Sequence, residues 1–261
     1  KEDFNFLIVG HWLKGDLGQD RKDIGMAIKT FATVFQYLPK DKRPGLIVKT
    51  SHAGFSVIDR EATREKIERV VQSYGDKCPS IYLVHGDLEE TDMANLYHHP
   101  KVKAMVSFAK GEGYGRPLAE FTLTGKPILA SGWSGQVDFL PKEHSVLLEG
   151  ELTQVHESAS DDFIMKEAQW FTVNYNMAAN KLYDIGDGIK DLMYSINRME
   201  NNIINSLDNL TYSTNESYGV LNKSITTQLK SIDSSININN LLTGIQTYQM
   251  YKVNQNTKRI E

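Results

Sequence analysis

The chain of 261 residues carries a net charge of −4 at neutral pH, 40% hydrophobic residues and one cysteine, Cys78. This length is enough for one or two domains, and the mildly acidic balance argues against a general nucleic-acid binder. A single cysteine excludes an intramolecular disulfide and a cysteine-rich metal site, and no apolar run approaches the roughly 18–20 residues of a membrane-spanning helix.

The first part of the chain alternates short apolar runs with helical patterns. The apolar runs predict buried strands, and the 3.6-residue patterns between them predict helices. Strands that alternate with helices indicate a parallel sheet covered on both faces. The expected strands are 4–10, 46–50 and 81–85, and the expected helices are 21–38, 61–74 and 89–97.

Residues 104–140 are the most informative stretch. Proline suits the first turn of a helix and glycine its end, and glycines in a loop let the backbone approach a ligand closely. The expected order is a strand at 104–108, a glycine-rich loop at 110–116, a helix from Pro117 to Gly125, a strand at 128–130 and a turn between Gly132 and Gly135.

Two glutamates lie in this stretch, Glu112 in the loop and Glu120 one turn into the helix. Exposed backbone N–H groups at a helix start favour an anion such as a diphosphate. A carboxylate further along accepts hydrogen bonds from a ribose diol in other doubly wound nucleotide sites, and a loop carboxylate can bond a sugar hydroxyl. The alternative is a βαβ unit whose glycines serve only tight turns.

The order of residues in this stretch carries more information than its glycines alone. It reads E-G-Y-G-R-P-L-A-E from Glu112, then T-G-K-P-I-L-A-S-G-W-S-G-Q-V-D-F-L from Thr124. This resembles the donor-binding, C-terminal half of the retaining glycosyltransferases of the GT-B fold, the glycosyl transferases group 1 family, which includes glycogen and sucrose synthases. Arg116 departs from the family's usual apolar residue. The matching positions are Glu112, Gly113, Tyr114, Gly115, Glu120, Gly125, Pro127, Ala130, Ser131 and Gly135.

The resemblance implies a role for each site residue. Glu120 would hold the ribose and Glu112 the donor sugar, while Lys22 would offset the charge of the leaving diphosphate; Glu112 and Lys22 are thus the implied catalytic residues. Arg21 and Lys22 equally suit solvated positions at a helix start, and that alternative stays open. The further donor-binding residues are Gly113, Tyr114, Gly115, Arg116, Arg21, His11, Ser134 and Gly135.

No obvious metal-binding carboxylate pair accompanies these residues. Asp-x-Asp is absent from the sequence, so charge on a leaving group would be stabilised by backbone N–H groups and basic side chains. This agrees with the metal-independent, retaining transfer from a nucleotide diphosphate sugar that the resemblance implies, without a cofactor. The family places its acceptor site in a preceding Rossmann-like domain. Either such a domain precedes Lys1, or this copy of the fold serves another purpose; the acceptor is unknown.

The region after the motif predicts one more strand and a closing helix. The strand is expected at 145–148, and a break is expected at 185–188, where the sequence reads Ile-Gly-Asp-Gly. The predicted fold is therefore α/β, a Rossmann-like parallel sheet covered by helices over residues 1–185, with a helical tail at 186–261. The helix is expected over 161–183, with Phe163, Ala168, Phe171, Met177, Ala178 and Leu182 as its apolar set.

The tail has apolar residues at spacings of three and four from Ile189 onward. One apolar stripe on a polar helix cannot bury itself, so this near-heptad spacing predicts a coiled coil and a homo-oligomer. A helical hairpin on the globular domain and a disordered tail are the alternatives. The stripe comprises Ile189, Leu192, Ile196, Met199, Ile203, Leu207 and Leu210, and it resumes at Leu221, Ile225, Leu229, Ile232 and Ile236.

Two functions follow from these patterns. The first is a glycosyltransferase-like domain that binds a nucleotide sugar. The second is structural, because the Asn-, Ser- and Ile-rich tail is similar in composition to bacteriophage fibre, whisker and neck proteins. In both cases we expect no nucleic-acid or membrane partner and a location in the host cytoplasm or a virion, since the chain has no signal-peptide pattern or membrane helix.

Overall fold

The computed structural model describes residues 2–52, 54–143, 145–161 and 163–214. The chain divides into two compact units, one up to Gly186 and one from Asp187, and each is described by itself. Among the described residues, no helix has the length and apolar character needed to cross a membrane.

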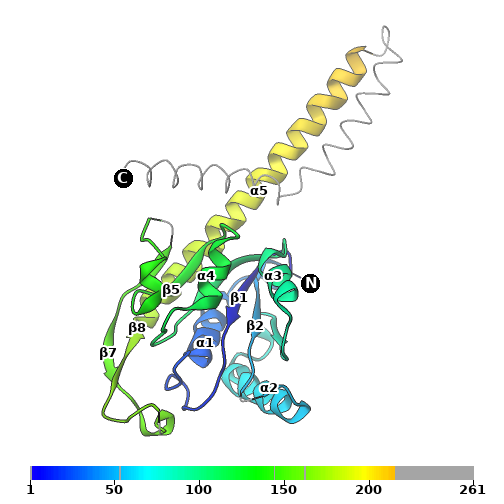
Figure 1. Ribbon diagram of the computed structural model, residues 1–261. Helices are drawn as coiled ribbons and strands as arrows, with labels where there is room; N and C mark the ends of the chain where they lie inside the picture. Colours follow the sequence, from blue (N-terminus) through cyan, green and yellow to red (C-terminus); the bar gives the residue numbers. More distant parts are fainter. Residues whose placement is uncertain (1, 53, 144, 162, 215–261) are drawn as a thin grey trace, which may run out of the picture. The chain divides into compact units, whose positions relative to one another are not determined.

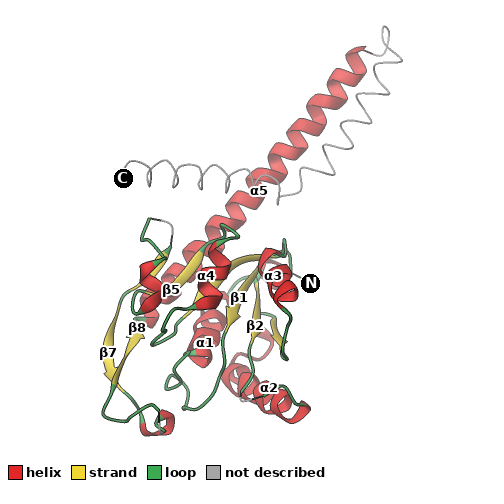
Figure 2. Ribbon diagram, in the orientation of Figure 1, coloured by secondary structure: helices red, strands yellow, loops and turns green. Residues whose placement is uncertain are grey.

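The first unit is built on a six-stranded sheet in the order β3-β2-β1-β4-β5-β6, and each strand is parallel to its neighbours. Helices alternate with these strands along the chain (Figures 1 and 2). The fold is thus α/β and Rossmann-like, as predicted. Its elements are β1 (Asn5–Val9), α1 (Ile24–Phe35), β2 (Gly45–Lys49), α2 (Val57–Val71), β3 (Ile81–Val84), α3 (Glu90–His98), β4 (Val102–Ser107), α4 (Arg116–Thr122), β5 (Ile128–Ser131) and β6 (Val146–Leu148).

Both faces of the sheet are buried, which is why its strands read as nearly continuous apolar runs. On one face, Phe6 of β1 packs against Phe31 and Phe35 of α1, with ring centroids 5.8 and 5.7 Å apart. The next residue along the strand points to the other face. There Leu7 belongs to a core cluster that includes Phe121 of α4. The alternation in one strand therefore fixes a helical layer on each side.

Two of the helices between the sheet strands begin three or four residues away from their predicted starts, and α3 and α4 begin within one residue of theirs. α1 begins at Ile24 rather than residue 21, because Asp23 has a left-handed backbone conformation with φ of 51° and cannot continue a right-handed helix. α2 begins at Val57, four residues before the expected start. There the Ser56 hydroxyl accepts a hydrogen bond from the Asp59 backbone N–H at 3.1 Å, a helix cap that the sequence does signal.

The helix expected over 161–183 is wrong in its first half. The strands β7 (Gly150–Gln154) and β8 (Gln169–Val173) instead pair as an antiparallel ribbon, seen at the left of Figure 1. Phe163, placed in the apolar face of that helix, is 95% exposed. The run Gln-Trp-Phe-Thr-Val of β8 is rich in aromatic and β-branched residues, which favour a strand.

The last helix, α5 (Tyr175–Thr214), begins where the Asn174 side chain accepts hydrogen bonds from the backbone N–H groups of Asn176 and Met177, both at 3.0 Å. The helix continues through residues 185–188, so the break predicted there is wrong as a feature of secondary structure. The change of compact unit does fall within it. The coiled coil stays a prediction, and its second stretch, 221–236, lies outside the described residues.

Four short 3₁₀ helices complete the described elements. One of them, η2, directly follows α2, and η3 directly continues the second glycine-rich turn. They are η1 (Lys40–Lys42), η2 (Gln72–Lys77), η3 (Gly135–Asp138) and η4 (Glu157–Ala159).

Candidate functional site

The strand order of the sheet reverses between β1 and β4, its two central strands. The chain leaves β1 toward β2 on one side and leaves β4 toward β5 on the other. Ligands of open α/β sheets bind outside the carboxyl ends of the strands at such a switch point. The loops that follow these strands, residues 10–23 and 108–115, contain most of the predicted site residues.

The predicted catalytic residues meet at this point although 90 positions separate them. The Lys22 ammonium forms an ion pair and hydrogen bond with Glu112 Oε1. Arg21 Nη1 lies 3.5 Å from Glu112 Oε2 and donates a hydrogen bond to Gly111 O at 2.8 Å. Burial lowers the pKa of Lys22, Glu112 opposes that shift, and the Arg21 charge adds to it. The Glu112 carboxylate therefore holds two cations in a mostly buried position.

The second glycine-rich turn fixes the backbone of Glu112. Gly135 N–H donates to Glu112 O at 3.0 Å, and the Ser134 hydroxyl donates to the same oxygen at 2.6 Å. Glu112 N–H in turn donates to Ser134 Oγ at 3.2 Å. Ser134 adopts φ of 72° to make this approach. A side chain at Gly135 would place Cβ 2.7 Å from the carbonyl carbon of Gly113, so the close approach requires glycine.

The remaining glycines of the loop differ in what they require. Gly115 has φ of 83° and begins α4, a conformation that glycine adopts without strain. Gly111 and Gly113 have no positive φ, and a Cβ at either would meet no atom within 4 Å. Open space beside backbone is the condition for close approach by a ligand. Tyr114 is exposed and packs on Phe139, with ring centroids 5.2 Å apart.

Glu120 lies in a separate pocket of 480 Å³ between α3 and α4, whose lining includes Val9 at the end of β1. Its carboxylate accepts hydrogen bonds from Arg116 Nε at 2.5 Å and from the Tyr97 hydroxyl at 3.2 Å. Burial and the charge of Glu120 raise the pKa of Tyr97, so the hydroxyl keeps its proton. Arg116 also reaches Glu90 at 3.1 Å. Arg116 and Glu120 are thus paired at one pocket, apart from Lys22 and Glu112.

His11 forms a hydrogen bond with a residue outside the two glutamate sites. Its Nδ1 lies 3.0 Å from Ser51 Oγ, at the end of β2. Burial lowers the pKa of His11, and the nearby charges of Lys49, Lys22 and Arg21 lower it further. The imidazole is therefore neutral at physiological pH.

Three buried residues and one half-buried tyrosine beside the site have no counterpart in the sequence predictions. Asp20, Asp23 and Lys110 are all at most 1% exposed, and the Tyr175 hydroxyl donates a hydrogen bond to Asp23 Oδ2 at 2.5 Å. No motif marks them, because a charged residue in a polar loop is normally solvated. Aspartate is one of the residues that tolerate the left-handed conformation of position 23, but a single aspartate in a polar loop does not mark it.

Asp20 supplies a test of the burial of this loop. Burial raises the pKa of Asp20 to about 6, and the charge of Asp23 adds to the shift. The pKa of Asp20 in the folded chain is thus above the ordinary aspartate value. The contribution of its protonated carboxyl to the free energy of unfolding is therefore present below pH ~4 and lost as pH rises through about 6. We expect Asp20→Asn to be about 1–3 kcal/mol more stable than wild type at pH 7.5 and equal to it at pH 4.

Urea unfolding at the two pH values measures this difference. Asp41→Asn is the matched control, because Asp41 is exposed in η1 and should show no pH-dependent gain. Equal stability of Asp20→Asn and wild type at pH 7.5 would contradict the raised pKa of Asp20.

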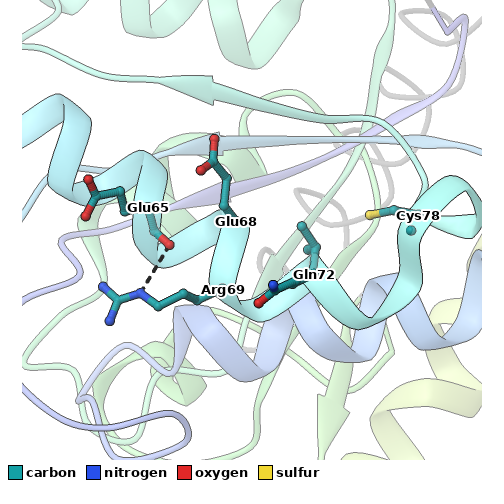
Figure 3. Close-up of a pocket in the computed structure, with 7 residues that line it drawn as sticks. Glu65, Glu68, Arg69, Gln72 and Cys78 are labelled. Atoms are coloured by element: carbon teal, nitrogen blue, oxygen red, sulfur yellow. Dashed lines mark hydrogen bonds between the residues drawn. The ribbon is translucent and has the colours of Figure 1, made fainter.

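A different hollow of 580 Å³ lies along α2 and the turns after it (Figure 3). Its labelled lining residues are Glu65, Glu68, Arg69, Gln72 and Cys78, and Arg69 Nε donates to the Glu65 carbonyl at 3.3 Å. Burial raises the pKa of the Cys78 thiol, which disfavours the reactive thiolate. The hollow shares no residue with the switch-point loops.

Within the part of the chain that the structure describes, no group of three His, Cys, Asp or Glu side chains is arranged to hold a metal ion. The fold and its loops define a Rossmann-like α/β protein with a candidate ligand site at the topological switch point. No family model and no curated protein matches the chain.

Several solved structures are similar to the chain. One is the C-terminal domain of a glycosyl transferase group 1 family protein from Francisella tularensis, at 16% identity and a TM-score of 0.46 over 74% of this chain and 86% of that one. Sucrose-phosphate synthase from Thermosynechococcus elongatus has 22% identity and a TM-score of 0.44, over 70% of this chain and 36% of that one. Trehalose-6-phosphate synthase has 10% identity and a TM-score of 0.41, over 55% and 32%.

This chain therefore spans about a third of the length of the two synthases. Because the TM-scores lie below 0.5 and the identities do not exceed 22%, these similarities carry no argument about activity. The functional proposal rests on the residues of this chain.

Proposed function

We propose that residues 1–185 bind a nucleoside diphosphate sugar and act in transfer of the sugar to an acceptor. One observation carries the proposal. Lys22 and Glu112, which the motif resemblance pairs in one donor site, form a mostly buried ion pair at the switch point. A solvated lysine at a helix start, the alternative for Lys22, would not be buried against a carboxylate from a loop 90 residues away.

The two parts of the site suit the two parts of such a donor. The pocket at Glu120 offers a carboxylate above apolar walls from Val9, Met93 and Leu123, which fits a ribose diol and a base. The switch point offers Lys22 and Arg21, together with the backbone N–H groups of residues 113–116, for a diphosphate. The sugar would then lie against Glu112 and the turn at Ser134 and Gly135.

The charges explain how the leaving group is stabilised. Lys22 and Arg21 now share the single carboxylate of Glu112. A diphosphate supplies further negative charge and would draw the Lys22 ammonium from full engagement with Glu112. Cations that are already in place when negative charge develops lower the barrier to transfer. We propose that this replaces a metal ion, and that the sugar is transferred with retention, as the motif resemblance implies.

Transfer also needs an acceptor site. We propose that a second domain or partner supplies it, because the described residues around Glu112 belong to one sheet and its loops. The structural alternative, a phage virion role on a coiled-coil stalk, gains no support from a contact among the described residues. Oligomer formation through the tail stays a prediction that sedimentation of the full chain would measure.

Titration calorimetry of the full chain with UDP, GDP and ADP, in the presence of a chelator, tests the donor site. We expect micromolar binding of one of them, and at least tenfold weaker binding in Glu120→Ala, because a hydrogen bond to a charged group is worth about 1.5–3 kcal/mol. Glu120→Gln keeps an acceptor for Tyr97 and separates loss of charge from loss of packing.

The matched control is Glu68→Ala, which removes an exposed carboxylate from the hollow on α2. We expect its affinity to equal that of wild type. Unchanged affinity in Glu120→Ala would remove the ribose role of Glu120. Absence of binding for all three nucleotides by the folded chain would overturn the proposed function.

A further inference from the structure

A cluster of polar residues around the buried pair Lys110 and Asp23 adjoins the Lys22–Glu112 pair in the two site loops. The Lys110 ammonium lies 3.4 Å from Asp23 Oδ2 and donates a hydrogen bond to Thr172 Oγ1 at 2.9 Å. The Tyr175 hydroxyl donates to the same Asp23 oxygen at 2.5 Å. Lys110 and Asp23 are 1% and 0% exposed, so neither faces a ligand directly.

The cluster joins three segments that are distant in sequence. Asp23 ends the loop after β1, Lys110 lies in the loop after β4, and Thr172 and Tyr175 belong to β8 and the start of α5. The backbone reinforces the connection, because Lys110 N–H donates to Arg21 O at 2.8 Å and Lys110 O accepts from Phe171 N–H at 3.0 Å. Lys110 is therefore bonded to all three segments.

The sequence places this cluster next to the site residues. Asp23 directly follows Lys22, and Lys110 comes two residues before Glu112. Loops hold a constellation less precisely than strands or helices do, unless the neighbouring residues are themselves locked. A buried ion pair is seldom justified by stability alone, since apolar residues of the same volume serve as well. Fixing the relative position of two charged loops is a role that an apolar pair would not fill.

We propose that Lys110, Asp23 and Tyr175 are positioning residues that hold Lys22 at Glu112 and thereby set the affinity for the diphosphate, an inference whose ligand rests on the proposed function. They act on the ligand through Lys22 and Glu112. The pocket at Glu120 does not depend on them, because its contacts come from α3 and α4.

The first variant is the double substitution Lys110→Met with Asp23→Asn, which removes both buried charges together. Because one positive and one negative charge are removed together, the net charge of the cluster is unchanged, and asparagine tolerates the left-handed position of Asp23. The second variant is Tyr175→Phe, which removes one hydroxyl and keeps the ring contact with Phe108 at 6.2 Å. If the double variant does not fold, as near-ultraviolet circular dichroism would show, Tyr175→Phe decides both readouts below.

The first readout needs no ligand. The side-chain ammonium of Lys22 is observed by nuclear magnetic resonance in protein labelled with ¹⁵N-lysine and assigned with Lys22→Met. In wild type the buried ion pair should give a protected signal, distinct from those of exposed lysines. We expect the variants to lose that protection while they remain folded. A Lys22 signal identical to wild type would overturn the inference, whatever the protein binds.

The second readout compares nucleoside diphosphates with monophosphates. UDP, GDP and ADP, and the matching UMP, GMP and AMP, are titrated into wild type and variants. For the diphosphate that binds, we expect roughly tenfold weaker affinity in the double variant, because small displacements of positioned groups are costly. In Tyr175→Phe we expect about 2- to 12-fold. Affinity for the monophosphate, held at Glu120, should change less than twofold.

A merely structural role gives a different pattern. If the cluster only stabilises the fold, the folded double variant should bind the diphosphate and the monophosphate as tightly as wild type does. That result would overturn the inference. Equal losses for diphosphate and monophosphate would also overturn it. Failure of wild type to bind any diphosphate would refute the proposed function instead, while the Lys22 signal still decides the positioning role.

Discussion

Lys22→Met is expected to weaken nucleoside diphosphate binding by about 10- to 100-fold, because it removes a charge-assisted contact of about 1.5–3 kcal/mol. Methionine keeps most of the volume of the lysine stem beside Gly10, whose Cβ position would lie 3.4 Å from the Lys22 chain. Arg21 stays within 3.5 Å of Glu112, so the carboxylate keeps one cation. The fold should therefore survive, and the loss should fall on the ligand.

Calorimetric titration of the full chain measures this effect. Affinity for the matching monophosphate should fall less than affinity for the diphosphate, because the proposed ribose site at Glu120 is not altered. Lys29→Met is the matched control, since it removes the same charge from an exposed position on α1. A diphosphate affinity unchanged from wild type would remove Lys22 from the donor site and restore its alternative as an ordinary residue before a helix.

The six-stranded sheet is the part of the fold that the sequence predicts well. Its strands are buried on both faces, so each reads as a short apolar run whatever its neighbours are. The β7–β8 ribbon has no such local signature, because Phe163, Ala168 and Phe171 happen to fall near helical spacing. The strand-favouring residues of β8 compete with that helical spacing, and the pairing of residues 150–154 with residues 169–173, a property of the tertiary structure, decides between them.

The site divides in the same way. Residues from Glu112 to Gly135 are close in sequence, and the motif keeps them together through one βαβ unit. The resemblance implies Lys22 as a site residue, but its position beside Glu112 follows from the topology, because the order of β1 and β4 in the sheet decides that its loop meets Glu112. Lys110 and Asp23 escape prediction altogether, since each is an ordinary loop residue until the other segment covers it.

Gly135→Ala is expected to damage both the fold and the site. The added Cβ would lie 2.7 Å from the Gly113 carbonyl carbon and 3.1 Å from Glu112 O, and both are backbone atoms that no rotamer change can move. The two turns must separate, which breaks the hydrogen bond from Gly135 N–H to Glu112 O. We expect a loss of about 1–3 kcal/mol in unfolding free energy and a fall in diphosphate affinity of about 100-fold, because Glu112 is displaced.

Gly113→Ala separates these two effects on the same loop. A Cβ at Gly113 meets no atom within 4 Å and the residue has no positive φ, so its stability should stay within about 0.5 kcal/mol of wild type. If a donor diphosphate approaches the Gly113 backbone as proposed, Gly113→Ala should still weaken binding of the nucleoside diphosphate. Chemical unfolding and calorimetry of both variants therefore form one experiment. Stability of Gly135→Ala equal to that of Gly113→Ala would mean that the turns are not in the contact that fixes Glu112.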